Sequence, residues 1–142
     1  MGRSDKLALL FPGQGSQRTG MLEDLRAKSP AFAAHLDALD RASEATLGRS
    51  IVGLVSRAPP AEHDRELTAT DNAQPALGIY SLALARLAAE LGVVADYFVG
   101  HSYGELSALA AAGVLDQSAF LSLSIARGAL MAEAGALAPG AM

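Results

Sequence analysis

The apolar residues follow two kinds of pattern, which alternate along the chain. Residues 7–11, LALLF, form a short unbroken apolar run that ends at a Pro-Gly pair. Such a run is typical of a strand in a parallel sheet that is buried on both faces. Residues 93–99, VVADYFV, are rich in residue types that favour strands and lead into Gly100. We therefore expect two strands, the first of them fully buried.

Elsewhere the apolar residues recur every three or four positions, which is the period of a helix. Glycines, prolines and capping residues predict where these helices begin and end, and the expected helices span residues 30–48, 50–56, 71–92, 105–112 and 116–136. Residues 57–65 carry two adjacent prolines and several charges, so they are expected to form a loop. Strands that alternate with helices indicate an α/β fold with a parallel sheet flanked by helices.

Composition excludes several classes of protein. The chain has 142 residues, is 51% hydrophobic and 18% charged, and carries a net charge of −4. It is too apolar for a disordered segment and lacks the basic excess of a nucleic-acid binder. No apolar run approaches the length of a membrane span, and the N-terminal run is too short for a signal peptide. Because the sequence has no cysteine, thiolate sites are excluded. We expect a cytoplasmic protein that binds neither nucleic acid nor membrane.

One motif carries candidate chemistry, the run from Gly100 through His101, Ser102 and Tyr103 to Gly104. It matches Gly-x-Ser-x-Gly, the nucleophile elbow, and stands between a predicted strand and a predicted helix, as that motif requires. The serine of an elbow has a strained backbone, and the flanking glycines let neighbouring segments approach without a Cβ clash. The following helix directs its N-terminus at any oxyanion that forms there. Ser102 is the candidate nucleophile.

A serine nucleophile usually needs a histidine base, and none of the three histidines is a good candidate. His101 is adjacent to Ser102, so its side chain is directed away around the turn, where we expect it to pack and form hydrogen bonds. His35 is expected to be an ordinary, partly buried helix residue, and His63 a solvated loop residue. Either Ser102 works without a base or the chain is incomplete.

The loop after the first predicted strand contains Gly13-Gln14-Gly15. Gly-x-Gly after a strand is half of the dinucleotide-binding fingerprint, but Arg18 occupies the position of the third glycine. We expect a tight loop at the same sheet edge as Ser102. There Gln14 can offer an amide to a substrate or an oxyanion; the alternative is an ordinary turn.

Arg127 is the other unusual residue. Its neighbours at helical spacing are apolar, namely Phe120, Leu123, Leu130 and Met131, which predicts that Arg127 lies on the buried face of the last helix. A buried cation without a partner costs several kcal/mol. The residues alone leave the partner open: a carboxylate of the protein, solvent reached by extension of the side chain, or a substrate carboxylate held by two parallel hydrogen bonds.

Four features carry a resemblance to a known family: FPGQGSQ at 11–17, QPA at 74–76, GHSYGE at 100–105 and the arginine 25 residues after the serine. With these features, the sequence resembles malonyl-CoA:acyl-carrier-protein transacylases and the acyltransferase domains of polyketide and fatty-acid synthases. The motifs occur in the family's order and approximate spacing. The resemblance implies the α/β-hydrolase-like large part of the acyltransferase fold. It also implies that residues 1–142 are the N-terminal part of the catalytic domain, without the ferredoxin-like small subdomain and the remainder.

The resemblance implies a role for each motif residue. Ser102 is implied to take a malonyl-type acyl group from coenzyme A as an ester and to pass it to the phosphopantetheine thiol of an acyl carrier protein. Gln14 and the backbone N–H of Tyr103 are implied to form the oxyanion hole. Arg127 is implied to clamp the free carboxylate of the acyl group. No permanently bound cofactor and no metal are expected.

Gln74 and His101 are implied to bind substrate in the same pocket, although His101 is not the family's base. That base is implied to lie in the remaining part of the domain, so this chain alone should be inactive. Two alternatives stay open: an acyl hydrolase or esterase on the same scaffold, and a non-catalytic interaction module. A hydrolase has no need of Arg127 for a substrate carboxylate. An interaction module explains the missing base, but it does not explain why Ser102, Gln14 and Arg127 occur together.

Overall fold

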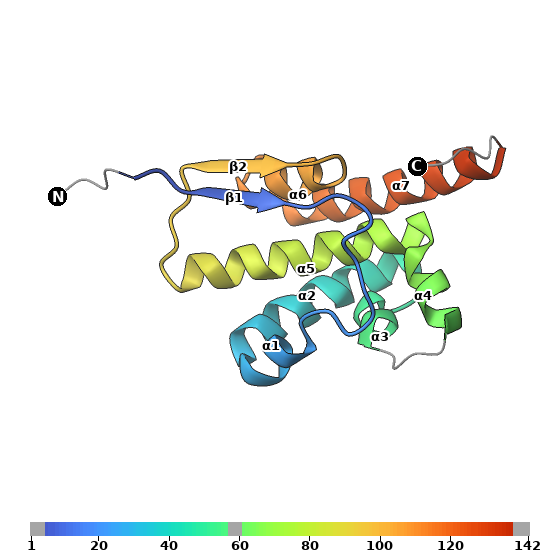
Figure 1. The fold of residues 1–142 in the computed structure, drawn as a ribbon, viewed down its shortest axis with the longest axis horizontal. Coiled ribbons are helices and arrows are strands. Elements are labelled where there is room, and N and C mark those ends of the chain that lie inside the picture. The colour runs from blue at the N-terminus through green and yellow to red at the C-terminus, as the bar shows by residue number, and fades with distance from the viewer. Residues whose placement is uncertain (1–4, 57–60, 138–142) are drawn as a thin grey trace.

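Two short parallel strands lie beside a set of helices built around one long helix. The computed structural model describes residues 5–56 and 61–137. Along the chain the elements are β1 (Ala8–Phe11), α1 (Glu23–Lys28), α2 (Pro30–Leu47), α3 (Ile51–Ser56), α4 (Ala61–Thr68), α5 (Thr70–Glu90), β2 (Tyr97–Gly100), α6 (Gly104–Ala111) and α7 (Gln117–Leu137) (Figure 1). The predicted α/β class is confirmed, with more helix and less sheet than the alternating pattern indicated.

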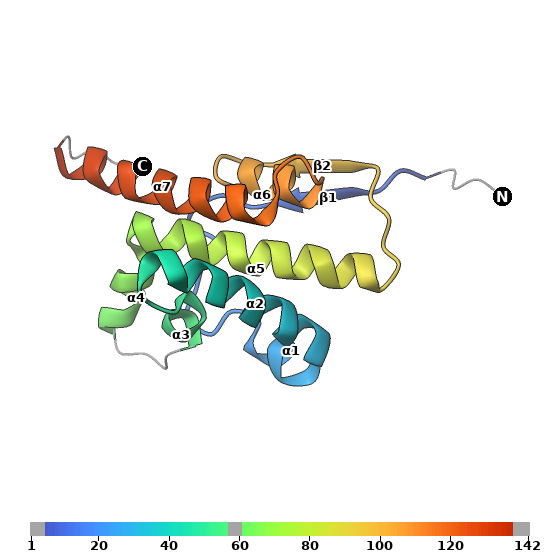
Figure 2. The same cartoon turned by 180° about the vertical axis from the view of Figure 1, so that it is seen from behind.

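The long helix α5 lies at the centre of the arrangement. The sheet, α6 and α7 lie on one side of it, and α1 to α4 lie on the other (Figures 1 and 2). The deepest core side chains come from α2, α3, α5 and α7, and each is 0% exposed: Phe32, Leu36, Leu39, Ile51, Val55, Ile79 and Phe120. Three of these, Phe32, Leu36 and Leu39, form the buried face of α2 at the three- and four-residue spacing of a helix.

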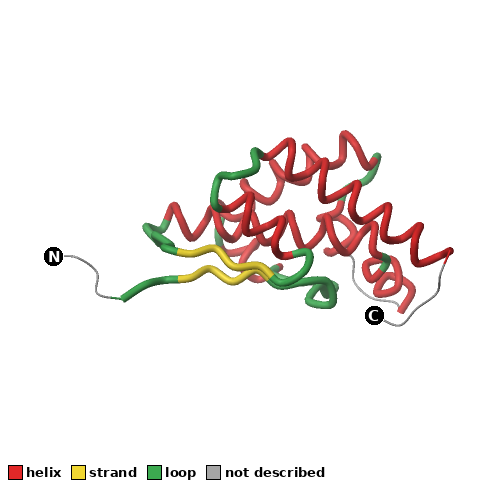
Figure 3. The backbone as a smooth tube through the Cα atoms, turned by 90° about the horizontal axis from the view of Figure 1, so that it is seen from above, coloured by secondary structure: helices red, strands yellow, loops and turns green. Residues whose placement is uncertain are grey.

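The sheet has two strands in the described part of the chain. Strands β1 and β2 pair in parallel, with Ala8 opposite Tyr97 and Phe11 opposite Gly100, and they lie side by side in Figure 3. Successive side chains on a strand point to opposite faces. Phe11 is buried against the helices, whereas Leu10 is 75% exposed because no described element covers the outer face. The prediction of a fully buried first strand is therefore wrong.

Several predicted boundaries also need correction. The second strand covers only Tyr97–Gly100, not all of 93–99. The predicted loop at 57–65 is wrong from residue 61 onward, because α4 begins there with charged residues that favour helices; residues 57–60 lie outside the described part. His63 therefore lies in a helix rather than a loop. The proline near the start of the long helix is expected in its first turn, but α5 begins at Thr70 and Pro75 lies beyond that turn, inside the helix.

Other capping signals are confirmed. Gly48 ends α2 in the left-handed conformation, with φ of 69°. At the start of α7, the backbone N–H of Ala119 donates to Asp116 Oδ1 at 2.8 Å. In the described residues, α7 is the one helix that is long and apolar enough, by length and composition alone, to cross a membrane. It packs along α5, and 22% of its most apolar stretch is buried.

Candidate active site

The turn between β2 and α6 has the predicted elbow geometry. Ser102 has φ of 51°, the left-handed region that a residue with a Cβ rarely adopts. A Cβ on Gly104 would overlap the carbonyl oxygen of Phe11, and one on Gly100 would overlap the backbone of Gly104. Both glycines are therefore required by close backbone packing. The strain and the packing together hold the Ser102 side chain out at the end of the sheet, where Ser102 is exposed.

Backbone N–H groups without an acceptor among the described residues lie near Ser102. The N–H groups of the two residues that follow Tyr103 already donate hydrogen bonds. Gly104 N–H donates to the His101 carbonyl at 2.9 Å, and Glu105 N–H donates to the Ser102 carbonyl at 3.2 Å. Within the described residues, the N–H groups of Tyr103 and Gln14 donate no hydrogen bond. Free N–H groups beside a nucleophile are what an oxyanion hole requires.

The loop after β1 lies against the elbow, as the sequence predicts. A Cβ on Gly13 would lie 2.8 Å from His101 Nδ1 and 3.4 Å from Ser102 Cβ. The His101 N–H donates to the Phe11 carbonyl at 3.1 Å, which continues the strand pairing into the turn. The His101 side chain lies beside Gly13 and remains exposed. The pairing of β1 with β2 therefore brings the Gln14 loop and Ser102 together.

The side chain of Gln14 is held between two residues of α5. Its Nε2 donates to Thr70 Oγ1 at 3.1 Å, and its Oε1 accepts from Gln74 Nε2 at 3.2 Å. Gln74 is fully buried, and its Nε2 also lies 3.2 Å from Met131 Sδ on α7. The Gln74 Oε1 accepts no hydrogen bond from the described residues. Gln14 and Gln74 thus form one chain of amides that fixes the loop beside Ser102. Sequence reasoning missed Thr70, whose only signal was its position one turn before Gln74.

The structure corrects the predicted environment of Arg127. The buried face of α7 consists of Phe120, Leu121, Ser124 and Gly128. Leu123 and Leu130, both predicted to be buried, are 46% and 65% exposed because they lie on the outer face of the helix. Arg127 lies at the boundary between these two faces and is half-buried. No carboxylate of the described residues pairs with it.

The contact that Arg127 does make is with the residue after the nucleophile. Its guanidinium carbon lies 5.9 Å from the centroid of the Tyr103 ring, within the range of a cation–π contact. Tyr103 is 0% exposed and shares a 2.6 Å hydrogen bond with Ser124 Oγ. Burial raises the pKa of the Tyr103 hydroxyl, and the bond with Ser124 opposes part of that shift. The phenol therefore stays neutral at physiological pH.

Neither described histidine side chain is an evident base for Ser102. The His35 Nε2 lies 2.8 Å from Glu90 Oε1 in a pair between α2 and α5. The His101 ring lies against Gly13, and the side chain of His63 is outside the described part. The described residues contain no cluster of three or more His, Asp or Glu side chains suited to a metal ion.

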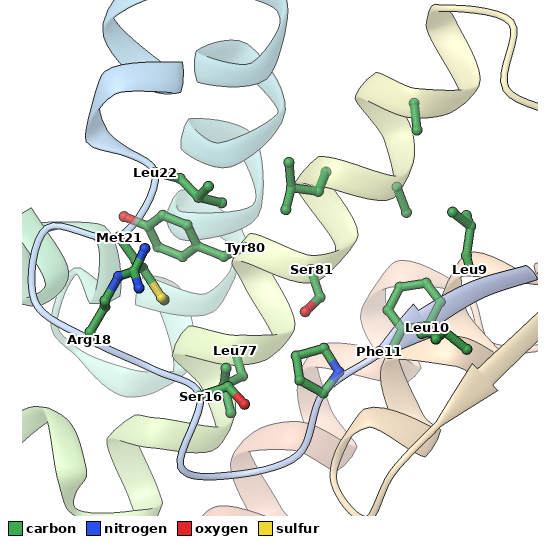
Figure 4. Close-up of a pocket in the computed structure, with 14 residues that line it drawn as sticks. Leu9, Leu10, Phe11, Ser16, Arg18, Met21, Leu22, Leu77, Tyr80 and Ser81 are labelled. Atoms are coloured by element: carbon green, nitrogen blue, oxygen red, sulfur yellow. The ribbon is translucent and has the colours of Figure 1, made fainter.

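A separate groove of about 490 Å³ lies between β1, the loop that follows it and α5 (Figure 4). Its lining is mainly apolar and includes Leu9, Phe11, Leu77 and Tyr80. None of the predicted site residues lines it. The groove lies along β1 and includes no residue of β2, so it is separate from the candidate chemistry at the end of the sheet.

Comparisons with known proteins show which family this chain is similar to. The model of a family described as an acyl transferase domain matches residues 8–142. The chain is 41% identical to the malonyl CoA-acyl carrier protein transacylase of Bacillus subtilis (strain 168), over 96% of this chain and 41% of that protein. It is 39% identical to polyketide synthase GfsA of Streptomyces halstedii, over 92% of this chain and 2% of that protein.

Solved structures show the same likeness. The acyltransferase domain from the second module of the salinomycin polyketide synthase is 42% identical, with a TM-score of 0.80 over 89% of this chain and 29% of that one. A type II polyketide malonyl-transacylase, solved with its acyl-carrier protein, is 38% identical, with a TM-score of 0.79 over 92% of this chain and 40% of that one. The chain spans about two fifths of the transacylases it matches. Fold, elbow and sequence similarity agree: the chain belongs to the acyl transferase domain family.

Proposed function

We propose that this chain carries the nucleophile and the acyl-binding residues of a malonyl-CoA:acyl-carrier-protein acyltransferase of polyketide or fatty-acid biosynthesis. The observation that carries the proposal is that the exposed, strained Ser102 is followed by Tyr103, whose ring lies 5.9 Å from Arg127. Arg127 is half-buried and has no carboxylate partner among the described residues. Relatives named malonyl CoA-acyl carrier protein transacylase support malonyl as the acyl group.

In the first half of the proposed reaction, Ser102 Oγ attacks the thioester carbonyl carbon and its proton passes to a base. The backbone N–H groups of Tyr103 and Gln14 stabilise the oxyanion, because both are free to donate. The Gln14 side chain instead fixes the loop, since Thr70 and Gln74 hold it. When the intermediate collapses, the C–S bond breaks, the coenzyme A thiolate takes the proton from the base, and a malonyl ester remains on Ser102.

In the second half, the phosphopantetheine thiol of an acyl carrier protein attacks the ester carbonyl and gives its proton to the base. The C–O bond then breaks, and the proton returns to Ser102 Oγ. Throughout, Arg127 binds the free carboxylate of the malonyl group through two parallel hydrogen bonds. This role distinguishes the proposal from the esterase alternative, which has no use for a cation at this point.

We also propose that the base is a histidine supplied by residues outside this chain. The described part offers Ser102 no suitable histidine, and the matched transacylases are more than twice as long as this chain. On this proposal the 142 residues alone do not turn over malonyl-CoA. They regain activity when the rest of the acyltransferase domain is present, in the same polypeptide or as a second one.

Mass spectrometry of the complete protein tests the nucleophile. After incubation with malonyl-CoA the intact mass should increase by one malonyl group, and Ser102→Ala should abolish the increase. Ser107→Ala, which changes a buried serine of α6, is the matched control and should retain the label. A label that survives in Ser102→Ala contradicts the nucleophile assignment, and rapid malonyl transfer by the 142 residues alone contradicts the proposed external base.

A further inference from the structure

The residue after the nucleophile is attached to α7 at two places one helical turn apart. The Tyr103 hydroxyl shares a 2.6 Å hydrogen bond with Ser124 Oγ, and the Tyr103 ring lies 5.9 Å from the guanidinium carbon of Arg127. Because Tyr103 directly follows Ser102 in the strained turn, a single fully buried side chain connects the nucleophile to the arginine.

A glycine in α5, which has no side chain, leaves space for the Tyr103 side chain. A Cβ on Gly78 would overlap the Tyr103 hydroxyl oxygen and would lie 2.8 Å from Phe120 Cζ. Glycine is unfavourable inside a helix by roughly 1 kcal/mol relative to alanine, yet Gly78 lies within α5 and is fully enclosed. Gly78, Ser124 and Tyr103 come from three different helices or their ends and fit one another. The ring has therefore little freedom to move relative to α5 and α7.

The type of contact matters for what Arg127 can still bind. A carboxylate partner would occupy the N–H donors of the guanidinium, but an aromatic ring attracts the cation through its π electrons and leaves those donors free. Within the described residues, the Tyr103 ring is the partner that Arg127 has. The ring can thus restrict where the guanidinium lies without competing with an incoming carboxylate.

We propose that Tyr103 is a positioning residue, whose ring holds the Arg127 guanidinium at a set distance from Ser102 and thereby sets the preference for acyl groups that carry a free carboxylate. This inference rests on the proposed function of Arg127 and adds a second residue to it. Tyr103 acts on the substrate carboxylate only through Arg127. Its side-chain role is separate from the proposed role of its backbone N–H.

The test is the ratio of kcat/KM for malonyl-CoA to kcat/KM for acetyl-CoA, measured on the complete protein. Tyr103→Leu removes the ring and should lower this ratio about 3- to 10-fold, mainly through a higher KM for malonyl-CoA, as expected for losing a partly exposed cation–π contact. Tyr103→Phe keeps the ring, and Ser124→Ala removes the same hydrogen bond from the other side. Both should lower the Tm yet keep the ratio within about two-fold of wild type.

A second comparison isolates the electronic effect from packing. Phenylalanine and 3,4,5-trifluorophenylalanine at position 103 have similar shapes, but the fluorinated ring has a weaker negative face. The fluorinated variant should show a lower malonyl-to-acetyl ratio than Tyr103→Phe. Equal ratios for these two variants would overturn the positioning role, and this comparison remains valid if Tyr103→Leu fails to fold. An equal loss of malonyl and acetyl transfer in Tyr103→Leu would also overturn it. A wild-type protein that never forms the malonyl ester on Ser102 would instead overturn the proposed function itself.

Discussion

Replacing Arg127 with alanine tests the proposed carboxylate site most directly. Losing one partner of a buried, charge-assisted hydrogen-bonded pair costs about 2–5 kcal/mol. Arg127 is only half-buried and has no ion pair within the described residues, so solvent screens part of its interaction with a substrate carboxylate. The lower part of that range applies, about 2–3 kcal/mol, which corresponds to a loss of about 30- to 200-fold in kcat/KM for malonyl-CoA.

The assay compares malonyl-CoA with acetyl-CoA as acyl donors for the complete protein and its Arg127→Ala variant. Transfer from acetyl-CoA should be unchanged or faster, because the cation no longer loses water against an uncharged methyl group. Arg127→Lys should recover only part of the malonyl activity, since an ammonium cannot form the two parallel hydrogen bonds of a guanidinium. Leu130→Ala is the matched control, because Leu130 lies about one turn further along α7 and is 65% exposed.

An equal loss of malonyl and acetyl transfer in Arg127→Ala would refute the reasoning. In that case Arg127 would stabilise the contact of α7 with Tyr103 rather than bind substrate. A thermal denaturation curve for each variant separates these outcomes, because a purely structural role predicts that the loss of activity follows the loss of stability.

Two further predictions concern stability. Gly104→Ala should lower the free energy of unfolding by more than about 2 kcal/mol in urea titrations, because its Cβ would overlap the Phe11 carbonyl oxygen. Gly135→Ala, where a Cβ meets no atom within 4 Å, should raise that free energy by up to about 1 kcal/mol; equal effects would contradict the packing argument. Burial raises the pKa of both Tyr80 and Tyr103 in the folded state, so the unfolded chain loses these phenol protons first as pH rises above about 10. The contribution of these two phenols to the free energy of unfolding should therefore be constant up to about pH 9 and fall above it, and Tyr80→Phe should reduce the slope of that fall.

Local sequence features accounted for most of the elements. The 3.6-residue period, with glycine, proline and aspartate at the ends, was enough to predict α2, α3, α5, α6 and α7, because caps and periodicity act over a few neighbouring residues. The same reasoning failed at α4, where adjacent prolines and several charges indicated a loop, and it did not predict the short helix α1. The family was also evident from three short motifs and one arginine, and the match over residues 8–142 confirmed it.

The candidate site was predicted in part. The Gly-x-Ser-x-Gly motif predicted the strained turn at Ser102 because the motif contains the glycines that such a turn requires. The position of Gln14 beside Ser102 also followed from sequence, since the carboxyl ends of parallel strands meet at one edge of the sheet.

Local patterns along the chain were sufficient to predict most helices, the elbow and the family. Which faces of those elements are covered depends on how the helices pack against one another. Helical spacing placed Arg127 among four apolar residues, but hydropathy does not say which side of a largely apolar helix meets α5, and packing chose the side with Ser124 and Gly128. The fit of Tyr103 against Gly78 and Ser124 likewise joins residues more than 20 positions apart, and no local pattern specifies such a contact. The burial of a side chain depends on its contacts with other elements, so it is known only once the packing of the helices is known.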